Sequence, residues 1–242
     1  MAENLDFVAR YAQSLGLTVL PRTVLVEGTS DAELFELAAR LEHAQTGVSL
    51  VGTDLAIAAA GEGDRGGTSG VIRELMILRG LARNYLQPNG RLHYRFVGLF
   101  DNDTAGKQAV RNARNLDRSL IEYKDMFRLW PVMPIPGSLD PTNVQLVFER
   151  ANALYKGLDW ELEDLLPPAF IGDFCSENPT FCARTVVVNG RAHRDFTREG
   201  KARLHRFVKT HAIRRDLVGV VDTLKALRFY LGLPDPLMVD FG

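Results

Sequence analysis

Two stretches of the chain decide its fold: residues 23–31, which read TVLVEGTSD, and residues 96–106, which read FVGLFDNDTAG. In each, an apolar run typical of a buried strand leads directly into acidic residues, a glycine and a stretch typical of a helix. An open parallel sheet carries its binding site at the carboxyl ends of its strands. We therefore expect the acids at these two strand ends to share one site; they are Glu27, Asp31, Asp101 and Asp103.

These acids indicate a site for a hard metal ion. All four offer carboxylate oxygens, and no cysteine accompanies them. Oxygen ligands suit Mg²⁺ or Mn²⁺, ions that commonly bridge protein carboxylates and the phosphate groups of a substrate. The simpler alternative, solvated acids at the ends of two strands, stays open at this point.

Hydrophobic periodicity predicts alternating strands and helices up to about residue 138. Crossover connections of this length, each containing a helix, favour an α/β fold with a parallel, twisted sheet flanked by helices. The expected strands are residues 24–27, 55–60, 92–100 and 126–135. The expected helices are residues 4–15, 30–43, 68–81 and 104–116. We expect Ser30 or Asp31 to cap the second of these helices and Thr68 to cap the third.

A glycine-rich loop at residues 61–66, GEGDRG, has the spacing of a dinucleotide-binding fingerprint. Its acids, Glu62 and Asp64, would face the pyrophosphate, and no acid follows at the distance of about 20 residues where a ribose contact is expected. We therefore expect the loop to border the carboxylate site and to help to hold a nucleic-acid phosphate.

Composition describes an ordinary globular protein of 242 residues, 46% hydrophobic and 24% charged. This length suits one large domain, or one domain with a substantial extension. No apolar run approaches the roughly 18 residues of a membrane span, and no secretory signal begins the chain, so we expect a cytoplasmic protein without a membrane partner. We expect Cys175 and Cys182 to be structural thiols, because the cytoplasm disfavours disulfides.

Charge is unevenly distributed, although the net charge is only −1. Residues 159–177 contain six acids and no base, whereas residues 184–215 contain ten bases and two acids. A basic stretch of this kind is either a solvated face or a footprint for a nucleic-acid backbone. The candidate metal site favours the second interpretation.

The two acidic motifs resemble those of the Toprim domain, the metal-binding fold of topoisomerases, bacterial primases, small RNA-maturation nucleases and OLD (overcoming lysogenization defect) family nucleases. This resemblance covers residues 21–138 and rests on the order of the motifs, with Asp101 lying 74 positions after Glu27. It implies that the acids bind the metal ion. The matching motifs are Glu27-Gly28, Asp31 and DNDTAG at residues 101–106.

The C-terminal half is similar to the OLD nucleases in two further segments. Residues 159–167, DWELEDLLP, resemble a segment that adds carboxylates to the metal site, and counting leaves Glu161, Glu163 and Asp164 as alternatives. Residues 200–204, GKARL, resemble a segment whose required lysine would be Lys201. Between them, an Asn-Gly pair predicts a hairpin. The resulting division is an N-terminal helix (residues 1–20), a Toprim domain (21–138) and a mostly helical OLD-like extension (139–242).

The resemblance implies a metal-dependent endonuclease that takes DNA in preference to RNA. Glu27 would be the general base, and Lys201 would stabilise charge at the scissile phosphate. Because the ATPase part of the larger OLD nucleases has no match in this chain, we expect a separate ATPase or sensor subunit, as in phage-defence systems, and a homodimer is compatible. The alternatives are a small RNA-maturation nuclease and a catalytically silent binding subunit.

Overall fold

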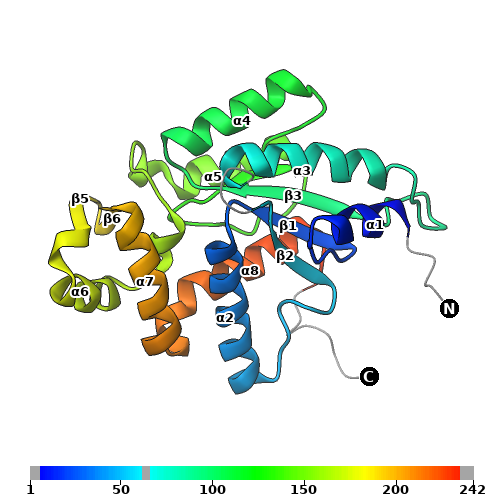
Figure 1. The fold of residues 1–242 in the computed structure, drawn as a ribbon. Helices are drawn as coiled ribbons and strands as arrows, with labels where there is room; N and C mark the ends of the chain where they lie inside the picture. The colour runs from blue at the N-terminus through cyan, green and yellow to red at the C-terminus, as the bar shows by residue number, and fades with distance from the viewer. Residues whose placement is uncertain (1–5, 62–65, 235–242) are drawn as a thin grey trace.

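The protein is built on a four-stranded sheet in the order β2-β1-β3-β4, as seen in a computed structural model that describes residues 6–61 and 66–234. All neighbouring strands are parallel, so they end at the same edge of the sheet (Figure 1). This confirms the predicted α/β class. The strands are β1 (Arg22–Val26), β2 (Leu55–Ala59), β3 (Arg95–Phe100) and β4 (Met126–Arg128).

Both faces of the sheet are buried, because successive strand residues alternate between two apolar cores. Val24 and Val97 face one core, whereas Leu25 and Phe96 face the other. The first core lies under α2 (Thr29–Thr46) and α8 (Val218–Tyr230) (Figure 1). The second lies under α1 (Phe7–Ser14), α3 (Gly67–Ala82) and α4 (Thr104–Leu116).

The C-terminal half extends the first core. Phe148, Phe174 and Leu204 belong to the same core as Val24. These residues come from α5 (Pro141–Ala151), α6 (Pro168–Glu177) and α7 (Arg198–His211). Short 3-10 turns lie in the connections of this half: η2 (Ala153–Tyr155) and η3 (Leu162–Leu165) between α5 and α6, η4 (Pro179–Phe181) after α6, and η5 (Arg214–Leu217) between α7 and α8.

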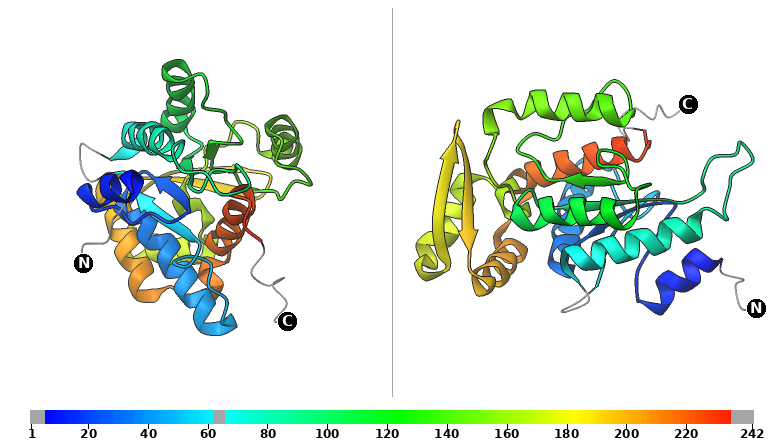
Figure 2. Two further views of the ribbon diagram at one scale, coloured as in Figure 1. Left: turned by 90° about the vertical axis from the view of Figure 1, so that its right-hand side faces the viewer. Right: turned by 90° about the horizontal axis from the view of Figure 1, so that it is seen from above.

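A β-hairpin stands beside these helices, formed by β5 (Cys182–Val188) and β6 (Arg191–Phe196). Its turn residues, Asn189 and Gly190, both have positive φ, which confirms the predicted Asn-Gly turn. The hairpin, α6 and α7 lie together at one end of the molecule (Figure 2).

One predicted strand was too long. The strand predicted over residues 126–135 ends at Arg128, because Pro131 and Pro134 lack the N–H groups that would continue the ladder. The chain beyond Arg128 leaves the sheet and leads towards α5.

Two N-terminal boundaries also shift. The helix predicted over residues 4–15 spans Phe7–Ser14, because the Asp6 side chain caps its first turn. The strand predicted over residues 92–100 begins at Arg95, since Leu92 pairs with Leu86 in a separate antiparallel bridge.

The residues that flank the glycine-rich loop adjoin the end of β1. Residues 62–65 of the predicted phosphate-holding loop lie outside the described residues. Beyond them, the Gly67 N–H donates to the Glu27 carbonyl oxygen (2.9 Å). The predicted cap at Thr68 is wrong, because α3 has already begun at Gly67.

Cys175 and Cys182 form a disulfide, contrary to the prediction of two free thiols. The chain reverses between α6 and β5, and this brings the two Cα atoms to 5.8 Å, a separation that a disulfide spans. The prediction failed because it argued from the cellular compartment, whereas the local turn decides the distance. The bridge fastens α6 to the start of the hairpin.

Gly106 is required by the close approach of α4 to the end of β3. A Cβ atom at residue 106 would overlap the Asp101 carbonyl oxygen. The Gly106 N–H also donates to Asp103 Oδ1 (2.7 Å), which fixes the first turn of α4. The glycine of the DNDTAG motif is therefore a requirement of backbone packing.

We predict that Gly106→Ala lowers the free energy of unfolding by about 1–3 kcal/mol, the usual effect of overpacking. Gly80→Ala is the matched control, because Gly80 is exposed on α3 and no atom lies within 4 Å of an added Cβ. The control should gain about 0.5–1 kcal/mol from its helix propensity. Denaturant unfolding measures both, and a Gly106→Ala variant as stable as the wild type would contradict the close approach.

Candidate functional site

The ends of β1 and β3 place Glu27 and Asp101 near each other. The two strands are adjacent and parallel, and each acid directly follows its strand. The backbone N–H of Leu162 donates to Asp101 Oδ1 (3.1 Å), and the Asn102 N–H donates to the Trp160 carbonyl (2.8 Å). These hydrogen bonds fasten the segment around η3 to the end of β3.

Burial and like charge raise the pKa of three acids at this edge. Burial and then Asp31 raise the pKa of Glu27 to about 7. Burial and then Glu163 raise the pKa of Asp31 to about 6. Burial, Glu163 and Glu27 raise the pKa of Asp101 well above its ordinary value. A cluster that resists ionisation for these reasons is a favourable place for a cation.

Asp31 and Asp103 also shape the turns that follow the strands. The Gly28 N–H donates to Asp31 Oδ2 (3.0 Å) from just before α2. Asp31 therefore lies within the first turn of α2, and the prediction that Ser30 or Asp31 caps this helix was wrong. Asp103 is the N-cap of α4 and accepts the Gly106 N–H. Each acid has one oxygen committed to the backbone.

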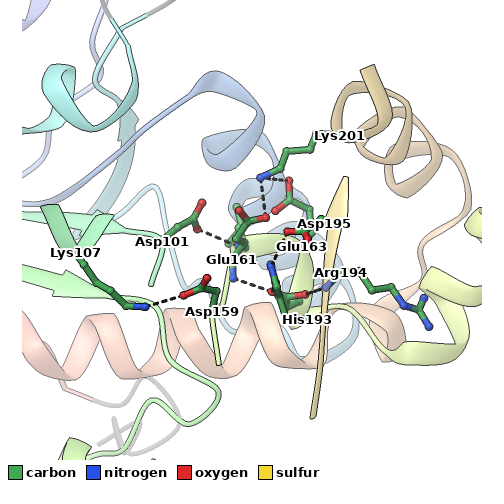
Figure 3. A network of polar contacts seen from close by, with 11 residues as sticks. Asp101, Lys107, Asp159, Glu161, Glu163, His193, Arg194, Asp195 and Lys201 are labelled. Carbon is green, nitrogen blue, oxygen red and sulfur yellow. Dashed lines mark hydrogen bonds and ion pairs between the residues drawn. The ribbon is translucent and has the colours of Figure 1, made fainter. Parts of the chain in front are cut away.

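Lys201 reaches the cluster from α7. Its Nζ lies 2.9 Å from Glu161 Oε2 and 3.5 Å from Glu163 Oε1 (Figure 3). Burial disfavours the ammonium, but Glu163, Glu161 and Asp101 together raise the pKa of Lys201, so it is charged at neutral pH. The same ammonium lowers the pKa of the strand-end acids and offsets their repulsion.

Asp164 and His193 form a buried ion pair beside this cluster. His193 Nδ1 lies 2.7 Å from Asp164 Oδ2, and this hydrogen bond raises the pKa of His193 to about 9. The backbone N–H groups of Glu161 (2.8 Å) and Arg194 (3.3 Å) donate to the same carboxylate. Asp164 thus joins the hairpin to η3, while Glu161 and Glu163 face Lys201.

The role of His193, which lies within the basic stretch at residues 184–215, was not predicted. Positions two apart on a strand share one face, so the spacing of His193 and Asp195 was an available signal. In the structure, His193 Nε2 lies 3.2 Å from Asp195 Oδ1. The ion pair of Lys107 with Asp159 (2.7 Å) was also missed, and Figure 3 shows it beside Asp101.

The strand-end acids are the type of ligand that a hard metal ion prefers, but their side chains are not already arranged around one point. A hollow of about 10 Å³, lined by Glu27, Asp31 and Asp101, has room for roughly one water-sized particle. Carboxylate oxygens are the donors that Mg²⁺ and Mn²⁺ prefer. Within residues 6–61 and 66–234, however, no three acidic, histidine or cysteine side chains stand together as a metal-binding group. Binding would therefore require the carboxylates to draw together.

Ion pairs within the protein already engage half of the basic stretch at residues 184–215. The five bases without an ion pair in the described part of the chain are the partly buried Arg194 and four exposed arginines, Arg184, Arg191, Arg198 and Arg206. The surface available to a phosphate backbone is therefore smaller than the charge count suggested. The pairs join Lys201 to Glu161, Arg203 to Glu199, Lys209 to Glu33, Arg214 to Glu42 and Arg215 to Asp216.

Comparison of the chain with protein-family models, with curated proteins and with solved structures found no match. The site must therefore be interpreted from its own residues.

Among the helices of the described ranges, none combines the length and the apolar character that crossing a bilayer requires.

We predict that Glu27→Gln stabilises the metal-free protein at neutral and alkaline pH. Because the pKa of folded Glu27 is raised from 4.5 to about 7, wild-type stability falls as pH rises through this interval. The variant should gain about 1–3 kcal/mol above pH 7 and little at pH 4.5. Denaturant unfolding in EDTA measures this, with Glu36→Gln on the exposed side of α2 as the control. A variant less stable than the wild type at every pH would contradict the repulsion.

We predict the opposite pH dependence for the ion pair of His193. Its pKa is raised from 6.5 to about 9, so its stabilisation is complete below pH 6.5 and is lost as pH rises through about 9. His193→Gln should therefore cost up to about 3 kcal/mol at pH 6.5, and progressively less towards pH 9. A difference from the wild type that stays constant over this range would exclude a charged pair.

Proposed function

We propose that this protein is a metal-dependent nuclease that hydrolyses phosphodiester bonds in nucleic acid. The observation that carries the proposal is the meeting of three strand-end acids, Glu27, Asp31 and Asp101, with the ammonium of Lys201. Acids that resist ionisation favour a bound cation, and an ammonium beside them suits the charge of a reacting phosphate.

The residues divide into metal-holding and charge-stabilising groups. Glu27, Asp31 and Asp101 would hold Mg²⁺ or Mn²⁺ together with Asp103, and Glu163 is favoured over Asp164 because His193 already engages Asp164. When bound, such an ion supplies a Lewis acid and lowers the pKa of coordinated water. Glu27, whose pKa is raised to about 7 by burial and Asp31 in the metal-free protein, would act as the general base by accepting a proton from that water. Lys201 would stabilise the negative charge that develops on the scissile phosphate.

The motif resemblance supports assigning the fold to the Toprim type and the enzyme to the OLD-like nucleases. A parallel sheet with acids after β1 and β3 is consistent with this assignment, and so is the contact of Lys201 with Glu161 and Glu163. On this basis the substrate is DNA in preference to RNA. A separate ATPase or sensor subunit would control the nuclease as part of a phage-defence system.

A second candidate function is a nucleic-acid-binding subunit with a silent site. It is favoured by the finding that no three metal-binding side chains stand together in the described ranges. In such a protein, the Lys201 ammonium would take the place of the metal ion by neutralising Glu161 and Glu163 permanently.

Cleavage assays test both candidates. The full chain is incubated with plasmid, linear duplex, single-stranded DNA and structured RNA, each with Mg²⁺, Mn²⁺ or EDTA. We predict metal-dependent cleavage that Asp101→Asn abolishes. Lys201→Ala should lower the rate by about 10²- to 10³-fold, the usual effect of losing one preorganised charge, with metal affinity nearly unchanged. Lys201→Arg should restore only part of the rate, because a planar fork does not replace a compact charge.

Lys209→Ala is the matched control, since Lys209 lies on the same helix and pairs with Glu33 (2.7 Å) outside the cluster. It should retain the wild-type rate. Wild-type cleavage by Asp101→Asn would overturn the nuclease proposal. Metal-independent binding of nucleic acid without any cleavage would favour the silent subunit.

A further inference from the structure

A cavity of about 480 Å³ lies between the hairpin, η3, α8 and the segment after β4. This volume is within the usual range for small-molecule sites. Its walls include both indole rings of the protein, Trp130 and Trp160. Arg191 and Asp222 also line it and are exposed, so the cavity opens to the surface.

Three of its lining side chains carry N–H donors that have no acceptor. Trp130 Nε1, Trp160 Nε1 and Arg194 Nη1 are all buried and make no hydrogen bond within the described part of the protein. Buried donors of this kind are rare and destabilising. Because all three donors surround one cavity, a ligand bound there could supply the missing acceptors. Small rotations of these side chains would bring their N–H groups to the ligand, since each residue already lines the cavity.

Trp130 is held as a rigid platform. The guanidinium carbon of Arg128 lies 5.1 Å from the centroid of the Trp130 ring. Arg128 is itself fixed by hydrogen bonds to Glu122 (2.7 Å) and Asn102 (2.7 Å). A planar group that stacks on this indole would therefore cost little side-chain conformational entropy.

The cavity adjoins the candidate nuclease site. Glu163 and Asp164 contribute to its wall, and Glu163 also lies 3.5 Å from Lys201. Figure 3 shows the Arg194 side chain extending away from Lys201 and Asp101. A group bound in the cavity would thus lie next to the strand-end acids without occupying their place.

We propose that this cavity binds a nucleobase. A base offers a flat π surface for the partly exposed Trp130 indole, ring nitrogens and carbonyl oxygens for the unpaired N–H donors, and amino groups for the carboxylates of Glu163 and Asp222. Those two carboxylates would repel a ligand bound only through phosphate. The identity of the ligand rests on the proposed function, in which the base belongs to a nucleotide beside the cleaved bond.

Intrinsic fluorescence reports directly on this cavity, because it contains the only two tryptophans of the chain. The full-length protein is titrated in EDTA with a single-stranded oligonucleotide, an abasic oligonucleotide of equal length and each nucleoside monophosphate. We expect saturable quenching by the oligonucleotide and little by its abasic counterpart. Quenching by monophosphates alone would identify a free nucleotide as the source of the base, which also supports the cavity.

Variants are compared by the anisotropy of a labelled oligonucleotide. Trp130→Ala should weaken binding about tenfold or more, as losing one base–aromatic stack usually does. Trp130→Phe, which keeps an aromatic ring but loses the N–H, and Arg194→Gln should each weaken it less. Arg150→Gln is the control, because Arg150 is exposed on α5 outside the cavity.

Equal quenching by the abasic oligonucleotide, no quenching by any ligand, or wild-type affinity in both Trp130→Ala and Arg194→Gln would overturn the inference. These outcomes are separate from the fate of the nuclease proposal, because binding is measured without metal. Base binding by a protein that never cleaves would support the base-binding cavity and contradict the nuclease proposal. Cleavage by a protein whose Trp130 and Arg194 variants bind normally would support the nuclease and contradict the base-binding cavity.

Discussion

The crowding of carboxylates at the ends of β1 and β3 is the constraint on which the rest of the structure depends. Glu27, Asp31 and Asp101 are partly removed from water and repel one another, so their ionised forms are unfavourable. Lys201 is the cation that relieves this repulsion, and two further acids, Glu161 and Glu163, hold it in place. The ammonium and the acids therefore stabilise one another only when the fold brings them together.

This dependence explains why the two halves of the chain share one core. The sheet supplies the strand-end acids, but their counter-charge comes from α7, far along the sequence. The C-terminal half must therefore be docked firmly. Hydrogen bonds from Leu162 and Asn102 hold η3 at the end of β3, and the ion pair of Asp164 with His193 holds the hairpin against η3.

How much the sequence could predict depends on the range of each interaction. Glu27 and Asp101 could be assigned to one edge because apolar runs and turns are local signals. Lys201 could be assigned only through a family resemblance, since no local pattern shows which acids an ammonium reaches across the fold. The pairing of His193 with Asp164 escaped prediction for the same reason, because it depends on how the hairpin folds back onto η3. The disulfide is a local contact, and it was missed because the cellular compartment was considered in place of the turn between α6 and β5.

In the DNDTAG motif, Gly106 and Asp101 are required for different physical reasons. The glycine is needed because α4 passes against the Asp101 carbonyl, whatever the side chain of residue 101 does. A descendant of this protein could therefore lose Asp101 and still preserve the glycine. Gly106 and the N-cap Asp103 serve the strand-to-helix turn, whereas Asp101 serves its chemistry, so these parts of the motif are free to diverge in evolution.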